Sequence, residues 1–277
     1  MTGRGDCRQV ILLLTACVKP NYGGDRPKAD VELRRREYVA AVEWYLLNTP
    51  YKVVLCDNSG TDITADLRRG AWGGVRLEVL TYSAAPIPAS RSYGYGEMDI
   101  VEYALAHSRL LCSAGPSDIV VKITGRLKLL NIRPIVSHLL RRSRDGRPFV
   151  SAYVNGRAAV GGDCRFIFST PDYMRRLAGM KQQLWFWFNF ERVMTCCAFT
   201  MMSEGKTRLI FPPLPPRVSG ESGGRTAVYD TSTLQYVKAC VKHAVRKVLF
   251  DAGLLPRKTT VAEMIKVIPL PAELAAE

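Results

Sequence analysis

A cationic turn follows an apolar run near the middle of the chain. Residues 118–124 read Asp-Ile-Val-Val-Lys-Ile-Thr, and Gly125 and Arg126 come directly after them. The apolar, β-branched residues are typical of a buried strand. Lys122, Thr124 and Arg126 would then lie at or near its end, where guanidinium and ammonium groups can donate charge-assisted hydrogen bonds to phosphate oxygens. This passage predicts a site for a phosphate-bearing ligand at the edge of an α/β sheet.

A second apolar run, residues 51–56, ends in the polar sequence Asp57-Asn58-Ser59-Gly60. The Asp57 carboxylate and the Asn58 amide could form hydrogen bonds with a ligand at this strand end. The same composition is also typical of an Asx turn that closes a strand. The sequence leaves both interpretations open.

Gly94, Gly96 and Glu97 precede an apolar pattern that predicts a helix from Glu97 to Leu111. Free backbone N–H groups at the start of a helix can bind an anionic group. A Gly-x-Gly pair also occurs in simple turns, so it does not by itself identify such a site.

Four passages together resemble the nucleotide-sugar glycosyltransferases of the GT-A kind, and more closely a group of bacterial surface-polysaccharide (capsule and O-antigen) transferases. They are residues 10–18, residues 56–60, residues 93–97 with the Lys-Ile-Thr-Gly-Arg sequence at 122–126, and Gly-Asp-Cys-Arg-Phe at 162–166. They span roughly the first two thirds of the chain, and Lys-Ile-Thr-Gly-Arg is the most specific. The resemblance implies a GT-A-like α/β fold, a UDP sugar as the expected donor, and transfer of the sugar to a glycan of lipopolysaccharide or capsule. It also implies that the base or ribose of the donor is held at the turn that contains Asp57 and Asn58.

Metal-dependent members of that class carry an Asp-x-Asp pair where this chain has Thr124, Gly125 and Arg126. A hydroxyl, a glycine and a guanidinium do not hold magnesium as two carboxylates do. We therefore expect no metal site and no cofactor besides the donor, with Arg126, helped by Lys122, neutralising the departing nucleoside diphosphate. The alternative is that Lys122 pairs with a buried carboxylate and Arg126 faces solvent.

Glycosyl transfer also needs a group that deprotonates the acceptor hydroxyl, usually a carboxylate in inverting enzymes of this architecture. Glu191, which follows the aromatic run at 184–190, is the first candidate for this catalytic base. Asp163 and Glu97 are the reserves. Glu191 could instead form an ion pair with Arg192 or another base.

Asp163 and Arg165 precede a strand expected at 165–169, and we interpret them as sugar contacts, with a surface ion pair as the alternative. The aromatic run at 184–190 is interpreted as part of the core, with an acceptor-stacking wall as the alternative.

Hydrophobic periodicity predicts strands and helices in alternation, which is typical of an α/β sheet with right-handed crossovers. Strands are expected at 10–18, 51–56, 75–80, 118–124, 149–154 and 165–169, and helices at 30–48 with an Asp30 cap, 97–111, 135–142, from Pro171 onward, and 233–254. We expect one domain over 1–277. Its parts would be a nucleotide-sugar-binding half (1–130), an acceptor half (131–211), a flexible loop (212–230) and a C-terminal helical extension (231–277).

A formal charge of +14 over 277 residues implies an anionic partner. The basic residues are scattered and form no known nucleic-acid motif, so we expect a nucleotide sugar and a glycan or lipid-linked glycan acceptor instead. A basic nucleic-acid-binding protein and a non-catalytic nucleotide-sugar-binding protein remain the alternatives. The basic amphipathic helix at 233–254 is either packed with a solvated face or lies on an anionic membrane.

The chain has eight cysteines, no C-x-x-C pair and three histidines, so a zinc site is not expected and a reducing cytoplasm fits best. The apolar run at 10–17 is too short to span a bilayer. Leu14-Thr-Ala-Cys17 looks like a lipoprotein cleavage box, but cleavage would remove the first strand. We therefore expect a cytoplasmic protein, at most in contact with the inner face of the membrane.

Overall fold

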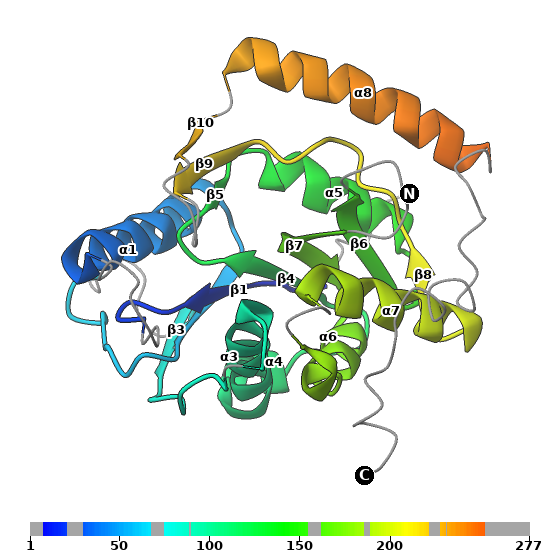
Figure 1. The fold of residues 1–277 in the computed structure, drawn as a ribbon. Helices are drawn as coiled ribbons and strands as arrows, with labels where there is room; N and C mark the ends of the chain where they lie inside the picture. The colour runs from blue at the N-terminus through cyan, green and yellow to red at the C-terminus, as the bar shows by residue number, and fades with distance from the viewer. Residues whose placement is uncertain are drawn as a thin grey trace.

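The computed structural model of the chain describes residues 8–20, 30–67, 75–88, 90–154, 162–185, 189–221, 228–230 and 232–252. They form three main layers, with a sheet between two layers of helices (Figure 1). The predicted fold class, an α/β protein with a mostly parallel sheet flanked by helices, is confirmed.

The main sheet has the strand order β3-β2-β1-β4-β7-β6-β8. Its bounds are β1 Val10–Ala16, β2 Lys52–Asp57, β3 Leu77–Thr81, β4 Ile119–Thr124, β6 Phe149–Val154, β7 Gly162–Ser169 and β8 Arg208–Leu209. Strands β3, β2, β1 and β4 are parallel, whereas β7 runs antiparallel to both of its neighbours. Because β1 lies between β2 and β4, the chain leaves β1 first toward one edge and later toward the other.

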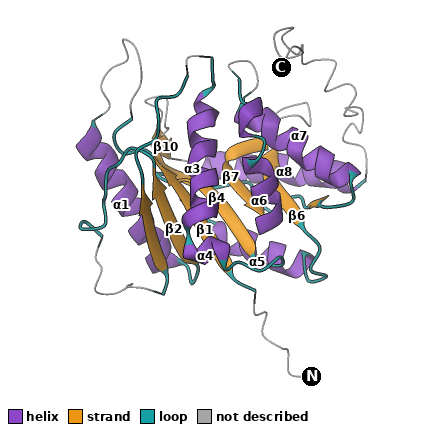
Figure 2. Cartoon of the chain, turned by 90° about the horizontal axis from the view of Figure 1, so that it is seen from below, coloured by secondary structure: helices purple, strands orange, loops and turns teal. Residues whose placement is uncertain are grey.

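Helices cover both faces of this sheet (Figure 2). Their bounds are α1 Val31–Asn48, α3 Tyr93–His107, α4 Arg109–Cys112, α5 Ile132–Arg142, α6 Pro171–Ala178, a 3-10 turn Lys181–Gln183, α7 Phe190–Ser203 and α8 Thr233–Asp251. One core cluster joins α1 and α5 to the sheet, and the other joins α3, α6 and α7 to its opposite face. Helix α8 lies outside α5 as a further layer (Figure 1).

Alternation along the strands explains why both faces are apolar. In β1, Leu12 and Leu14 belong to the first cluster, while Ile11 and Leu13 belong to the second. Successive side chains of a strand point to opposite faces, so a strand buried on both sides must be apolar throughout. Thr15 is the polar exception in this strand, and it is buried.

The helix boundaries follow from local caps. The predicted cap of α1 is confirmed, because Asp30 Oδ1 accepts from the backbone N–H of Leu33 at 2.8 Å. The predicted helix 97–111 is wrong at both ends. Helix α3 begins at Tyr93 and ends at His107, and Ser108 separates it from the short helix α4. The buried Glu78 carboxylate accepts from Ser108 Oγ at 2.6 Å, which stabilises this second helix start.

The segment predicted as an irregular loop at 212–230 contains two strands, and the prediction is wrong to that extent. Strand β9 (Val218–Glu221) pairs with β10 (Val228–Asp230) and with β5 (Lys128–Leu129) in a small second sheet. Asn131 holds the segment that leads into β9. Its Oδ1 accepts from the N–H of Arg217 at 2.9 Å, and its Nδ2 donates to the Pro215 carbonyl at 2.8 Å. Residues 222–227, and residues 253–277 of the predicted C-terminal extension, lie outside the described part of the chain.

Gly125 allows the end of β4 to approach β1 closely. A Cβ atom there would lie 2.6 Å from the Thr15 carbonyl oxygen and 3.2 Å from the Tyr38 ring. The carbonyl belongs to the backbone of a buried strand, so it cannot move aside as a flexible side chain could. Glycine is therefore required at position 125 by the packing of β4 against β1, whether or not a ligand binds.

We therefore expect Gly125→Ala to lower the free energy of unfolding by about 1–3 kcal/mol, the usual cost of overpacking. Urea denaturation monitored by circular dichroism measures this change. Gly115→Ala is the control, because its Cβ would lie 3.7 Å from Asp118 Oδ2, an ordinary contact distance. Equal stability of the two variants would contradict the packing role of Gly125.

Candidate functional site

Glu97 lies at the switch point of the sheet. In open α/β sheets, ligands bind beyond the carboxyl ends of the strands where the strand order reverses, which is here between β1 and β4. Oε1 of Glu97 accepts from Thr15 Oγ1 of β1 at 3.0 Å and from Thr124 Oγ1 of β4 at 3.0 Å. One carboxylate of α3 thereby joins the ends of two neighbouring parallel strands.

Lys122 points from the interior of β4 toward the same carboxylate and is completely buried. Its Nζ donates to Glu97 Oε1 and, at 2.7 Å, to the backbone carbonyl of Cys164 in β7. It also lies 5.1 Å from the centre of the Phe190 ring. A buried ammonium group needs such partners. Lys122 therefore pairs with a partly buried carboxylate, as the alternative interpretation held, and its ammonium group meets that carboxylate at the ends of β1 and β4.

Cys164 connects this pair to Glu191, the second residue of α7. Its Sγ donates to Glu191 Oε1 at 3.1 Å. Burial first, and then the charge of Glu97, raises the pKa of the Cys164 thiol well above its ordinary value. The thiol therefore stays protonated and remains a donor. We call this group the Glu97 cluster: Thr15, Glu97, Lys122, Thr124, Cys164 and Glu191.

Arg126 lies on the other side of the sheet from the Glu97 cluster. Its guanidinium donates to Glu37 Oε2 of α1 at 2.6 Å, and the side chain is only 5% exposed. Helices α1 and α3 cover opposite faces of the sheet. Lys122 and Arg126, which were predicted to act together, are therefore separated by the sheet. The alternative of a solvent-facing Arg126 is also wrong. A contact between Arg126 and a phosphate stays a prediction, and such a ligand would compete with Glu37.

Asp163 and Arg165 form an ion pair with each other. Asp163 accepts from Arg165 Nε at 2.8 Å and from its NH2 group at 2.5 Å. The guanidinium lies 4.6 Å from the centre of the Tyr229 ring of β10. Since they alternate with Cys164 along β7, they face away from the Glu97 cluster. The ion pair considered as an alternative exists, with Asp163 buried, and a role in sugar binding stays a prediction.

Asp57 closes the turn after β2. Its carboxylate accepts from the N–H of Val18 at 2.8 Å, from the N–H of Ser59 at 2.8 Å and from its Oγ at 2.7 Å, and from the N–H of Thr61 at 3.2 Å. The side chain is buried. This is the Asx-turn role that the sequence allowed, and it leaves Asp57 little capacity for a ligand.

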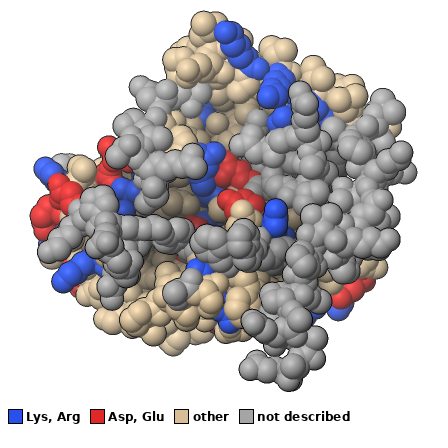
Figure 3. All heavy atoms as spheres, viewed as in Figure 1, with Lys and Arg blue, Asp and Glu red and all other residues tan. Residues whose placement is uncertain are grey.

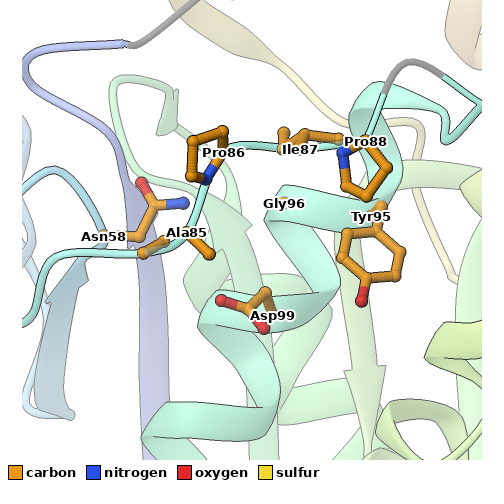
Figure 4. Close-up of a pocket in the computed structure, with 9 residues that line it drawn as sticks. Asn58, Ala85, Pro86, Ile87, Pro88, Tyr95, Gly96 and Asp99 are labelled. Atoms are coloured by element: carbon orange, nitrogen blue, oxygen red, sulfur yellow. The ribbon is translucent and has the colours of Figure 1, made fainter.

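The neighbouring Asn58 lines a pocket of about 180 Å³ between the end of β2 and α3 (Figure 4). The other lining residues are Ala84, Ala85, Pro86, Ile87, Pro88, Tyr95, Gly96 and Asp99. Among the described residues, Oδ1 of Asn58 is buried and has no hydrogen-bond partner. In Figure 4 the amide nitrogen of Asn58 points toward Gly96 and the amide oxygen points away from it, so the pocket presents the donor end of this amide to a ligand.

Charged and aromatic groups surround this pocket. Asp99 accepts from Tyr82 Oη at 2.7 Å and from Lys181 Nζ at 2.8 Å. The guanidinium of Arg91 lies 4.1 Å from the Trp185 ring centre and 5.3 Å from that of Tyr95. Asp99 of α3 and Arg91, which precedes α3, are therefore both bound to the segment that contains Lys181 and Gln182.

Gly94 and Gly96 let α3 pack closely against its surroundings. A Cβ at Gly94 would lie 2.8 Å from Phe190 Cβ, and one at Gly96 would lie 2.6 Å from Ile87 Cδ1. Gly94 thus allows the start of α7 to pack against α3, and Gly96 allows Ile87 of the pocket wall to do so. Anion binding by the N–H groups at this helix start stays a prediction.

The sequence analysis missed three residues of this region: Thr15, Tyr95 and Asp99. Thr15 carried a signal, because it is a lone hydroxyl near the end of an otherwise apolar run. Tyr95 and Asp99 are four residues apart, so they share one face of α3 with the pocket. This spacing is a signal only if both residues lie in the same helix, and the predicted helix begins at Glu97, after Tyr95. Residues 186–188 of the aromatic run lie outside the described residues, whereas Leu184 and Phe190 are buried.

Within the described ranges, no group of three or more His, Cys, Asp or Glu side chains is arranged to hold a metal ion. None of the described helices is both long enough and apolar enough to cross a bilayer.

No family model and no curated protein matches this sequence. Solved structures with a similar fold include a candidate nucleotide-diphospho-sugar transferase from Desulfovibrio desulfuricans G20, with 12% identity, a TM-score of 0.42, and coverage of 74% of this chain and 80% of that chain. They also include a 4-diphosphocytidyl-2C-methyl-D-erythritol synthase, with 10% identity, a TM-score of 0.40, and coverage of 84% of this chain and 98% of that chain.

Because Lys122 and Glu97 compensate each other's charge, we expect substitutions at these two positions to have strongly non-additive effects on the free energy of unfolding. Glu97→Ala would leave the buried ammonium group with the Cys164 carbonyl as its remaining described acceptor, and should lower the free energy of unfolding by about 3–5 kcal/mol. Adding Lys122→Met removes the uncompensated charge and should recover most of that loss. Urea denaturation of the two single variants and the double variant measures the coupling. A double variant less stable than Glu97→Ala would contradict it.

Proposed function

We propose that this protein is a glycosyltransferase that moves a sugar from a nucleotide-diphosphate donor, in the first instance a UDP sugar, to a glycan acceptor. The observation that carries the proposal is that the Asn58 pocket and the Glu97 cluster meet along α3 at the switch point of the sheet. A donor lying across this edge would have its base in the pocket and its sugar beside the carboxylates.

The pocket suits the base of the donor. At about 180 Å³ it is smaller than the roughly 300–1,000 Å³ of a site for a whole drug-sized ligand, so it can take one ring-sized group. The Asn58 amide offers an acceptor and two donors to the edge of a heterocycle. Tyr95, Pro86 and Pro88 supply apolar walls. Uracil, with an N–H between two carbonyl groups, matches one amide well.

Protein groups would balance the charge of the departing diphosphate without an Asp-x-Asp metal site. Arg126 follows the last residue of β4 by two positions, and its guanidinium has donors suited to phosphate oxygens. The N–H groups around Gly94 and Gly96 add the positive end of a helix. Binding would require Arg126 to exchange or share its bond with Glu37.

Glu191 is the carboxylate best suited to take the proton of the acceptor hydroxyl. Asp163 is bound through both oxygens by Arg165. Glu97 already receives three donors at Oε1, including a charged one, so this oxygen has little room for an acceptor hydroxyl. Glu191 is oriented by a neutral thiol, and Phe190 precedes it on α7. These contacts favour Glu191 over both reserves.

The acceptor belongs, in this proposal, to a bacterial surface glycan, either free or lipid-linked and made at the inner face of the cell membrane. The four motif passages support this class, and a charge of +14 suits a phosphate-bearing acceptor. A non-catalytic protein with the same pocket would bind the donor without turnover, so binding and transfer need separate tests.

The first test measures donor binding. UDP should raise the melting temperature in the presence of EDTA, since the base pocket and Arg126 require no metal. Asn58→Leu should weaken UDP binding by about 5- to 150-fold, which is the effect of about 1–3 kcal/mol for a lost hydrogen-bonding group in a buried site. The exposed Asn48→Leu is the matched control. Thermal shift and titration calorimetry with a panel of nucleoside diphosphates provide the measurement.

Two results would contradict this account of donor binding. One is stabilisation by nucleotides only when manganese is added, which would indicate a metal site built by other carboxylates. The other is salt-sensitive RNA or DNA binding with no response to any nucleotide, which would favour a nucleic-acid-binding protein.

The second test concerns the proton acceptor. Glu191→Gln keeps the shape of the side chain and removes its basicity, so transfer should slow by roughly 100-fold or more while donor affinity stays unchanged. Single-turnover transfer and donor titration separate the two quantities. Asp163→Asn, made in parallel, should retain far more activity. A normal rate in Glu191→Gln together with a collapse in Asp163→Asn would move the role to Asp163.

A further inference from the structure

Helix α8 presents a continuous apolar stripe to solvent. Five side chains at intervals of three or four residues form it, which places them on one face of the helix. Their exposed fractions are 66% for Leu234, 52% for Val237, 63% for Val241, 56% for Val245 and 66% for Val248. Single exposed apolar residues are normal, but a row of five along one helix is a patch that marks an interaction surface.

The contacts between α8 and the rest of the protein come from a different face. Tyr236 Oη accepts from Asn131 Nδ2 at 2.9 Å, and Nε2 of the buried His243 lies 2.7 Å from the Pro212 carbonyl oxygen. The His243 ring also packs 4.8 Å from that of Phe211. These contacts fix the rotation of the helix on the body, so the stripe of Leu234 and the four valines points outward.

Basic side chains flank the stripe. Lys238 and Lys242 are exposed beside it, and the partly exposed Arg246 follows one turn after Lys242, whereas Lys247 lies one turn after the buried His243, on the face toward α5. Figure 3 shows Lys and Arg atoms along the helix at the top of the molecule, next to uncharged surface. Burial, and then the charges of Arg141, Arg142 and Lys247, lower the pKa of His138 in α5. Positive charge therefore continues from α8 onto the helix beneath it.

We propose that α8 binds the surface of a bilayer rich in anionic phospholipid. The apolar stripe enters the boundary between headgroups and acyl chains, and Lys238 and Lys242 contact lipid phosphates. The charges favour this partner over a second copy of the chain, because pairing two α8 stripes would bring like charges together. The five apolar side chains favour it over nucleic acid, which binds basic surfaces without needing such a stripe.

Vesicle binding tests the proposal without any assumption about the reaction. The full-length protein should sediment with vesicles of equal parts phosphatidylglycerol and phosphatidylcholine, and far less with phosphatidylcholine alone. Lys238→Glu/Lys242→Glu should weaken the binding by roughly 30-fold or more, since each lysine near an anionic surface contributes about a fivefold factor and the new glutamates are repelled by the lipid phosphates. Val241→Glu/Val245→Glu should weaken it by at least about tenfold, because the stripe can no longer insert.

The control variant Arg175→Glu/Arg176→Glu changes the same number of charges on the exposed face of α6, on the opposite side of the sheet. It should bind vesicles with almost wild-type affinity. Circular dichroism and UDP titration of each variant establish that the fold and the nucleotide pocket are intact.

Three outcomes would overturn the proposal. The first is equal binding to neutral and anionic vesicles, or no binding to either. The second is an equal loss in the α6 control, which would reduce the effect to net charge. The third is a wild-type dimer, seen by light scattering, that Val241→Glu/Val245→Glu converts to a monomer without any change in vesicle binding, which would assign the stripe to self-association.

Discussion

The ammonium group of Lys122 is fully buried in an α/β sheet, where an uncompensated charge would cost several kcal/mol. Glu97 supplies the opposite charge, and the same oxygen also accepts from Thr15 and Thr124. Compensating one cation therefore brings α3 to the ends of β1 and β4, while the Cys164 carbonyl adds β7. The shape of the candidate site follows from this requirement before any ligand binds.

Close backbone packing makes that arrangement possible. Gly125 lets the end of β4 lie against the Thr15 carbonyl, and Gly94 lets the start of α7 lie against α3. A side chain at either position would push apart the elements that carry Glu97, Thr124 and Glu191. The glycines that the motif analysis associated with phosphate binding thus also set the distances between the polar groups, and the two roles do not exclude each other.

The order and type of the main strands and helices could be predicted from sequence, because hydrophobic period and caps such as Asp30 are local signals, whereas the short strands β5, β8, β9 and β10 could not. The partners of the charged residues could not. Lys122 and Glu97 are 25 residues apart, and Arg126 and Glu37 are 89 apart. In a continuing strand, Lys122 and Arg126 would share a face. The strand ends at Thr124, and Gly125 turns the chain so that Arg126 reaches α1 on the other side.

The two surfaces argued to meet ligands lie on different sides of the molecule. The Asn58 pocket is bounded by β2 and α3, whereas α8 lies outside α5, on the face of the sheet opposite α3 (Figures 1 and 2). A bilayer beneath α8 would therefore leave the pocket and the carboxyl ends of β1 and β4 open to a nucleotide arriving from solvent. A lipid-linked acceptor held in that bilayer would have to extend its glycan around the edge of the sheet. That geometry favours an acceptor whose reacting sugar stands well away from its lipid over one whose first sugar is attached directly to the headgroup phosphate.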